Sequence, residues 1–214
     1  MKRSLLAILI GTLLSTFTYG KYPRDWWKFI PPNGAPNWEI LPQEAADGEV
    51  ILSKRTELGI FSNLAKSPFT LDGESYESIE GLWQGMKYPD ANLKDDPRLK
   101  IEFPYTRKEV YGLSGWPSKD AGNMANDILD ENDIDWINYK DHKFNYVDYA
   151  QGSEFHLELI TRAIRAKVFQ NPKIKNLLKK TKGLVLKPDH HMSDEVPESF
   201  KYHQILMSIR DNEL

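Results

Sequence analysis

The sequence predicts an α+β fold that is predominantly helical, with a small N-terminal β-hairpin sheet packed on a helical body. Short strand-like runs come first, between residues 48 and 76, and apolar residues at helical spacing dominate afterwards, above all between 153 and 211. Strands followed by helices are typical of the α+β class. Aromatic residues make up 12% of the 214 residues, which is enough to build a packed core.

Charge and cysteine content exclude several classes of protein. The 28 Lys and Arg against 31 Asp and Glu give a formal net charge of -3, and a surface that holds nucleic-acid backbone needs a basic excess. We therefore expect no stable nucleic-acid complex. The chain has no cysteine, which excludes disulfides, thiolate-bound zinc, iron–sulfur clusters and thiol nucleophiles.

Residues 1–20 have the layout of a secretory signal peptide. Lys2 and Arg3 supply a positive start, residues 5–14 are apolar, and small or polar residues follow up to Gly20. That apolar run is too short to span a bilayer. We expect cleavage near Gly20, a mature chain without a transmembrane segment, and a periplasmic or secreted location. An uncleaved anchor or a buried helix is the alternative.

Residues 21–47 are rich in proline and tryptophan, and residues 48–214 contain the folded domain. The prolines break any helix, and the indole rings of Trp26, Trp27 and Trp38 are costly to leave in water. The composition predicts an extended arm that lies across the domain. A disordered linker, or a ligand- or wall-binding role for Trp26 and Trp27, remains open.

The first half of the domain carries one strong turn signal and one helix start. The elements expected up to residue 104 are strands at 50–53, 59–64, 69–71 and 75–76, a helix at 79–88 and an irregular surface segment at 90–104. Asp72 and Gly73 predict a tight hairpin, because glycine tolerates positive φ. Ser78 is a typical helix N-cap, and Pro89 ends the helix.

The second half reads as mainly helical. The elements expected there are helices at 120–131, 153–170, 172–180 and 198–211, an extended run at 183–186, and loops at 132–152 and 188–197. Within 153–170, Phe155, Leu159 and Ala163 begin a broad apolar stripe at helical spacing. Asn171 followed by Pro172 favours a new helix start.

One face of the helix at 79–88 carries polar groups that can do chemistry. On this helix, Trp83, Gln84 and Lys87 follow Glu80 by three, four and seven residues. The four side chains therefore share a face. Glu80 and Lys87 are about 10 Å apart along the axis, and a sugar-sized group fits between them above Trp83. An ordinary solvated helix surface gives the same pattern, so this hypothesis needs further support.

Asp189, His190 and His191 form the other polar cluster, in the loop at 188–197. They are candidates for holding a ligand's hydroxyls or phosphate; a metal site or simple loop capping is the alternative, and no HxH or HxxxH spacing supports a metal. The chain has no P-loop, GxGxxG or GxSxG motif. Walker-type nucleotide hydrolysis, dinucleotide redox chemistry and α/β-hydrolase chemistry therefore have no support.

Several motifs, in order, resemble the NADAR (YbiA-like) family. They are Gly59-Ile-Phe-Ser-Asn-Leu64, Ser67-Pro-Phe-Thr-Leu-Asp-Gly73, Tyr76-Glu-Ser-Ile-Glu80, Trp83-Gln-Gly-Met-Lys87, Arg162-Ala-Ile-Arg-Ala-Lys-Val-Phe-Gln-Asn171 and Ile205-Leu-Met-Ser-Ile-Arg210. The resemblance spans about residues 50–210.

The resemblance implies an N-glycosidase that cleaves ribose or ADP-ribose from nitrogen, with no cofactor and a small ribosyl or ADP-ribosyl substrate. On this chain, Glu80 matches the family's catalytic glutamate and Lys87 its helix lysine. Phe61, Ser62 and Asn63 match the turn that lines the pocket. A carboxylate stabilises an oxocarbenium-like transition state; a lysine can form a Schiff base with the opened sugar or neutralise a phosphate.

The chain also departs from the family pattern. Gly81 stands where the family usually has histidine, and the Trp-Gly stretch before the last helix is missing. Near that place we expect Asp189 and His190 to take over ligand contacts. A non-catalytic protein that binds ADP-ribose or a nucleotide on the same fold is the alternative function.

Overall fold

The structure is a computed structural model that describes residues 21–145, 151–193 and 195–214. The expected signal peptide at 1–20 and part of the expected loop at 132–152 lie outside the described residues. The predicted α+β, predominantly helical fold is confirmed. Helices carry most of the regular structure, and the strands of the described residues pair in three two-stranded sheets.

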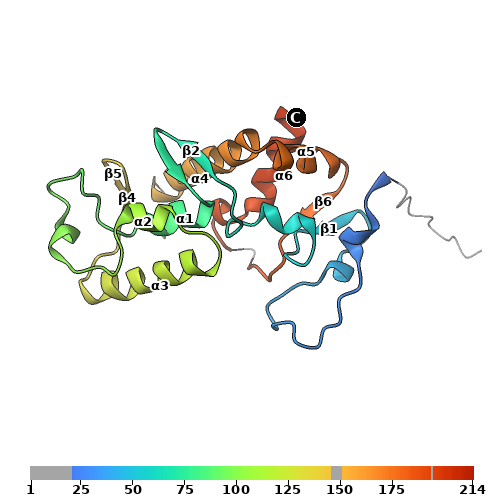
Figure 1. Cartoon of the computed structure of the whole chain (residues 1–214), viewed down its shortest axis with the longest axis horizontal. Helices are drawn as coiled ribbons and strands as arrows, with labels where there is room; N and C mark the ends of the chain where they lie inside the picture. The colour runs from blue at the N-terminus through green and yellow to red at the C-terminus, as the bar shows by residue number, and fades with distance from the viewer. Residues whose placement is uncertain (1–20, 146–150, 194) are drawn as a thin grey trace, which may run out of the picture.

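Helices and strands are distributed along the described residues. The helices are α1 (Ile79–Gly85), α2 (Arg107–Tyr111), α3 (Trp116–Glu131), α4 (Gln151–Gln170), α5 (Pro172–Lys180) and α6 (Tyr202–Glu213). The strands are β1 (Glu49–Ile51), β2 (Phe69–Leu71), β3 (Glu74–Tyr76), β4 (Ile137–Tyr139), β5 (His142–Phe144) and β6 (Val185–Lys187). Figure 1 shows α3 and the β4–β5 hairpin in one half of the molecule, and the arm of residues 21–47 beside β1 and β6 in the other.

The predicted hairpin is confirmed and is attached to the longest helix. β2 and β3 pair antiparallel, and the turn places Asp72 at φ 52° and Gly73 at φ 88°. The side-chain amide of Gln170, at the end of α4, donates to the Thr70 carbonyl at 2.8 Å and accepts from the Thr70 N–H at 2.8 Å. The Gln170 side chain therefore forms hydrogen bonds with the edge of β2 that a third strand would otherwise form.

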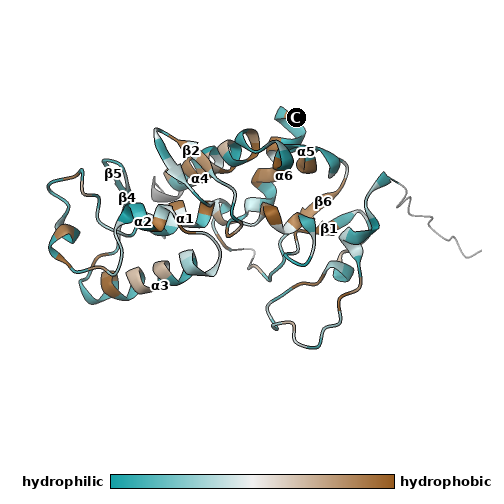
Figure 2. Ribbon diagram, in the orientation of Figure 1, coloured by the Kyte–Doolittle hydropathy of each residue, from teal (hydrophilic) through white to brown (hydrophobic). Residues whose placement is uncertain are grey.

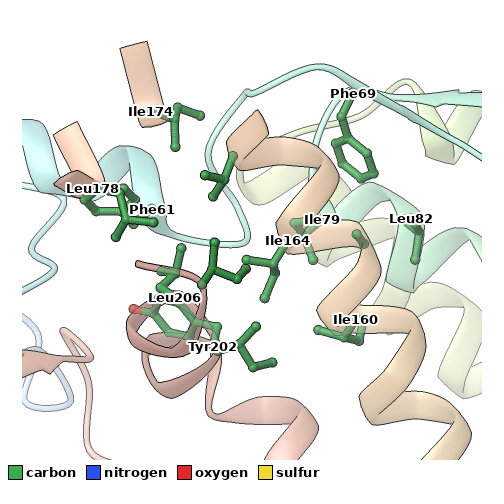
Figure 3. Close-up of a cluster of buried hydrophobic side chains, with 14 of the residues drawn as sticks. Phe61, Phe69, Ile79, Leu82, Ile160, Ile164, Ile174, Leu178, Tyr202 and Leu206 are labelled. Atoms are coloured by element: carbon green, nitrogen blue, oxygen red, sulfur yellow. The ribbon is translucent and has the colours of Figure 1, made fainter. Parts of the chain in front are cut away.

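Helix α4 lies at the centre of the core. Its apolar stripe, including Leu159, Ile160 and Ile164, is buried and packs with side chains from α1, α5 and α6 (Figure 3). Brown apolar positions alternate with teal polar positions along the helices in Figure 2. This amphipathic pattern is what the sequence periodicity predicts.

A parallel strand pair joins the start of the domain to its C-terminal third. β1 pairs with β6, with Val50 opposite Leu186. The arm packs beside this pair: Trp26 is fully buried in the main core cluster, and its indole N–H donates to Glu57 Oε1 at 2.8 Å. The arm is therefore part of the folded body.

Two of the expected N-terminal elements differ in the structure. The strand expected at 59–64 is wrong: Glu57–Phe61 is a 3-10 helix, capped by the Thr56 hydroxyl, which accepts from Leu58 N at 3.2 Å. The helix expected at 79–88 ends at Gly85. The carbonyl groups of Met86, Lys87 and Tyr88, which follow the helix, accept hydrogen bonds from the buried side chains of Arg98 and Arg107 instead of continuing the helix.

The segment at 90–104 lies mainly at the surface, as expected, but its residues Asp96 and Arg98 are buried. Arg98 is fully buried, donates to the carbonyls of Met86 and Lys87, and pairs with Asp96 at 2.7 Å. Arg107 donates to the Tyr88 carbonyl at 2.9 Å. Single charged side chains of a surface segment can be buried when each charge is paired and hydrogen-bonded.

Further along the chain, the expected loop at 132–152 contains the β4–β5 hairpin, with Lys140 at φ 53° in its turn. The helix expected at 120–131 starts earlier, at Trp116. Helix α2 was not expected at all. Helices α4, α5 and α6 and the extended run at 183–186 agree with the sequence to within a few residues.

Candidate functional site

The site is a cavity of about 540 Å³ between α1, α3, α4 and the loop at 188–197. This volume is within the range of small-molecule sites. Its aromatic wall residues are Trp38, Trp83, Trp116, His156, Phe200 and Tyr202. Its polar wall residues include Lys54, Ser62, Asn63, Glu80, Gln84, Lys119, His190, His191 and Ser199.

Glu80 lies on the cavity wall in the first turn of α1. Ser78 caps this helix by accepting from Gly81 N at 2.8 Å and donating to the Leu113 carbonyl at 2.9 Å. The Glu80 N–H donates to the Asn63 carbonyl at 2.9 Å. These three hydrogen bonds fix the backbone that carries the carboxylate. Glu80 itself is half-buried.

One oxygen of the Glu80 carboxylate is fixed by its neighbour on the helix. The Gln84 amide donates to Glu80 Oε1 at 2.7 Å. Gln84 packs so closely against α3 that a Cβ on Gly122 would lie 1.9 Å from Gln84 Oε1. Among the described residues, Glu80 Oε2 has no hydrogen-bond partner. This oxygen is available to a ligand.

Lys87 does not line the cavity. It follows the end of α1 and is buried, with Nζ 5.9 Å from the centre of the Trp83 ring. Burial and the nearby charge of Lys119 lower the pKa of Lys87 to about 8, against the opposing effect of Glu80. The helical face predicted for Glu80 and Lys87 is therefore interrupted by the early helix end.

The predicted turn at 61–63 is divided between cavity and core. Ser62 and Asn63 line the cavity, whereas Phe61 is buried in the core (Figure 3) and not on the wall. The Ser62 carbonyl accepts from Lys167 Nζ at 2.8 Å. Burial lowers the pKa of Lys167 to about 7. Sequence reasoning missed Lys167, although a lysine inside the apolar stripe of α4 is a visible signal.

Asp189 lies behind the cavity wall, and His190 lies on it. Asp189 is buried, pairs with Lys54 Nζ at 2.5 Å and contacts His190 Nδ1 at 3.2 Å. Burial alone raises the pKa of Asp189, but hydrogen bonds from His190 and Lys54 outweigh it and hold this pKa below its usual value. Asp189 therefore positions two wall residues and does not itself line the cavity.

Buried polar atoms without a partner gather at this cavity. Among the described residues, they belong to the wall residues Asn63 (Oδ1), Gln84 (Oε1), His156 (Nδ1) and Ser199 (Oγ). Leaving such atoms unpaired costs free energy, and a bound polar ligand removes that cost. His156 stacks on Trp83 with ring centres 4.3 Å apart, and burial lowers the pKa of His156 to about 4, so this ring is neutral at pH 7.

Two other kinds of site find no support in the described part of the chain. No group of three or more His, Asp or Glu side chains there is arranged to hold a metal ion. Within the same residues, no helix combines the length and apolarity needed to cross a membrane.

Comparisons with known proteins give two similarities. An uncharacterised 17.1 kDa protein from the Gp30–rIII intergenic region of enterobacteria phage T4 is 27% identical over 126 residues, 59% of this chain and 69% of that protein. The NMR structure of the E. coli protein YbiA is similar with a TM-score of 0.47 and 18% identity, over 78% of this chain and 86% of YbiA. No protein-family model matches the chain. Any activity has to follow from the residues of the chain itself.

Proposed function

We propose that the protein is an N-glycosidase that hydrolyses the bond between ribose C1 and a base nitrogen, in a ribose-phosphate N-glycoside or an (ADP-)ribosylated base. The observation that carries this proposal is the placement of Glu80. Its carboxylate lies on the wall of the cavity, one oxygen is fixed by Gln84 at 2.7 Å, and the other has no partner among the described residues.

This arrangement suits the transition state of C–N cleavage. As the bond to the base nitrogen breaks, positive charge develops on C1 and the ring oxygen of ribose, and an adjacent carboxylate stabilises that charge. Water then supplies a hydroxyl group to C1, and its proton goes to the departing nitrogen. Because Gln84 fixes the Glu80 carboxylate in advance, little reorganisation is needed during the reaction.

The unpaired polar atoms of the wall suit the sugar. A ribose presents hydroxyl groups that both donate and accept hydrogen bonds. Asn63 Oδ1 and the neutral ring of His156 offer acceptors, and Ser199 offers a hydroxyl group. Binding a sugar therefore removes the cost of several unpaired buried groups in one step.

Lys87 has a narrower role in this proposal than the family resemblance implies. Its ammonium group lies beside the Trp83 ring and off the cavity wall, so an attack on the opened sugar is not favoured by its position. We assign it an electrostatic role: its ammonium group and the Glu80 carboxylate attract each other.

A non-catalytic binding protein is the second candidate, favoured by Gly81. A Cβ at this position would lie 2.6 Å from the Leu113 carbonyl oxygen and 3.0 Å from that of Val110. The histidine that the family usually carries after the catalytic glutamate does not fit here. A cavity that kept its ligand contacts but lost this histidine would bind without turnover.

The experiment incubates residues 21–214 with ADP-ribosylated guanosine, NAD and ribosyl intermediates of riboflavin synthesis, and follows release of base or sugar by mass spectrometry. We expect release from at least one compound. In Glu80→Gln, which keeps the side-chain volume, release should fall by about 10²-fold or more.

Glu109→Gln is the matched control. Glu109 also lies in the first turn of a helix and accepts from its cap residue, Thr106, but it does not line the cavity. Equal activity in wild type and Glu80→Gln would refute the assignment of Glu80. Ligand-induced thermal stabilisation without any product would favour the binding protein.

We also propose that the protein is exported, on the composition of residues 1–20. Expression of the full chain in a bacterium should yield a periplasmic or secreted form that starts near Lys21, as read by intact mass. A full-length product confined to the cytoplasm would contradict export without bearing on the chemistry.

A further inference from the structure

Two exposed tryptophan side chains meet at the cavity wall. Trp38 comes from the arm and Trp116 from the first position of α3, and their rings are 40% and 58% exposed. The ring centres are 6.5 Å apart at 69°, an edge-to-face arrangement. Large exposed indoles that line one cavity are typical of a binding site.

Backbone hydrogen bonds at Trp38 and at Ile40 hold this part of the arm against residues 189–191. The His191 N–H donates to the Trp38 carbonyl at 3.4 Å, and the Ile40 N–H donates to the Asp189 carbonyl at 2.9 Å. The Glu39 carboxylate between them accepts from Arg55 at 2.8 and 2.9 Å. This exposed ring is therefore fixed by an ordered backbone.

Cationic groups accompany the two rings. Lys54 Nζ lies 5.9 Å from the centre of the Trp38 ring and is held by buried Asp189. Lys119, three residues after Trp116, lies on the same side of α3 and also lines the cavity. Aromatic rings with flanking ammonium groups suit a planar base that carries phosphate.

We propose that Trp38 and Trp116 form a stacking site for the purine or other planar base of a nucleotide in this cavity. The edge-to-face pair makes a corner in which the base lies flat on one ring and meets the edge of the other. The buried groups of Asn63, His156 and Ser199 on the same wall, which have no partner in the described part of the chain, supply the hydrogen bonds for the sugar. The proposal rests on the proposed function only for the placement of the ribose at Glu80. It makes the arm a determinant of ligand specificity.

The test compares ligands with and without a base. Affinity for AMP, GMP and ribose 5-phosphate is measured by calorimetry in a Glu80→Gln background, so that no ligand is consumed. Trp38→Ala and Trp116→Ala should each weaken AMP and GMP binding by about tenfold or more. Affinity for ribose 5-phosphate should change less than about twofold, because the sugar and phosphate keep their contacts.

Two further variants separate stacking from folding. Trp38→Phe keeps an aromatic face and should recover most of the affinity for AMP. Phe29→Ala removes an arm side chain that is 71% exposed and outside the cavity, and it should leave all three affinities unchanged.

The proposal is overturned if Trp38→Ala weakens ribose 5-phosphate as much as AMP, if it changes neither, or if AMP does not bind at millimolar concentration. These outcomes are distinct from failure of the glycosidase proposal, which is an absence of product from the wild-type protein. A selective loss of AMP binding supports the stacking site whether or not the protein turns its ligand over.

Discussion

At the scale of single residues, two buried lysines stand out near the cavity. Burial lowers the pKa of Lys87 to about 8 and that of Lys167 to about 7, each from 10.5. Lys167 Nζ keeps one hydrogen bond, to the Ser62 carbonyl at 2.8 Å. The native state therefore loses these protons at lower pH than the unfolded chain does.

This difference predicts how stability changes with pH. Between about pH 7 and pH 10.5 the unfolded chain binds more protons at these two lysines than the native state, so their contribution makes the free energy of unfolding rise with pH. Lys167→Met should show a smaller rise than wild type in urea denaturation at pH 7, 8, 9 and 10. Lys173→Met, at an exposed position, should keep the wild-type slope. If the free energy of unfolding of Lys167→Met rose with pH as steeply as that of wild type, the lowered pKa of Lys167 would be contradicted.

At the scale of elements, the contact between α1 and α3 sets the position of the carboxylate. Gln84 reaches from α1 to the backbone of α3 at Gly122, and the same side chain donates to Glu80. α1 has only Ile79–Gly85, so its own turns give little stability. Its orientation depends on this packing and on the Ser78 cap.

The prediction is that Gly122→Ala is harmful, although alanine favours a helix over glycine by about 1 kcal/mol. The added methyl group would meet Gln84 Oε1 at 1.9 Å and displace the Gln84 amide from Glu80. We expect a lower melting temperature and lower base release.

The matched control is Asn123→Ala, at an exposed position on the same helix, which should be neutral or slightly stabilising. The double variant Gly122→Ala/Gln84→Ala should regain stability, because the clash is gone, but not activity. A Gly122→Ala protein as stable as Asn123→Ala would show that Gln84 moves without cost.

At the scale of the whole molecule, the arm belongs to the core as well as to the cavity. Trp26 is fully buried in the main apolar cluster, and Trp38, twelve residues further along the chain, lines the cavity. One segment thus stabilises the fold at one point and meets the ligand at the other.

Removing the buried indole should therefore destabilise the whole domain. Trp26→Ala is expected to lower the free energy of unfolding by about 3–5 kcal/mol, measured by chemical denaturation, and Phe29→Ala by much less because Phe29 is exposed. Similar stability of the two variants would mean that the arm packs on the domain without being part of its core.

The sequence predicts the local features of this molecule well. The Asp72-Gly73 turn, the Ser78 cap and the apolar stripe of α4 each depend on a short stretch of chain, and each agrees with the structure. The cavity wall at Ser62, Asn63, Glu80, Trp83 and His190 was also among the expected site residues.

Features that depend on distant partners were not predictable in this way. Trp38 reaches the cavity because the 189–191 backbone bonds the residues around it, and no local pattern shows that contact. Arg98 and Arg107 look like surface charges until the carbonyls of Met86 and Tyr88 are placed beside them. The placement of Lys87 follows from the helix ending at Gly85, which these same arginines favour.

The pairing of β1 with β6 has a consequence for when the protein can fold. Glu49–Ile51 is synthesised well before its partner Val185–Lys187, because the paired residues Glu49 and Val185 are 136 positions apart. Closing such a long loop carries a larger entropy cost than local pairing, and it cannot begin before the partner strand exists. β1 thus remains without its native partner strand until residues 185–187 have been synthesised.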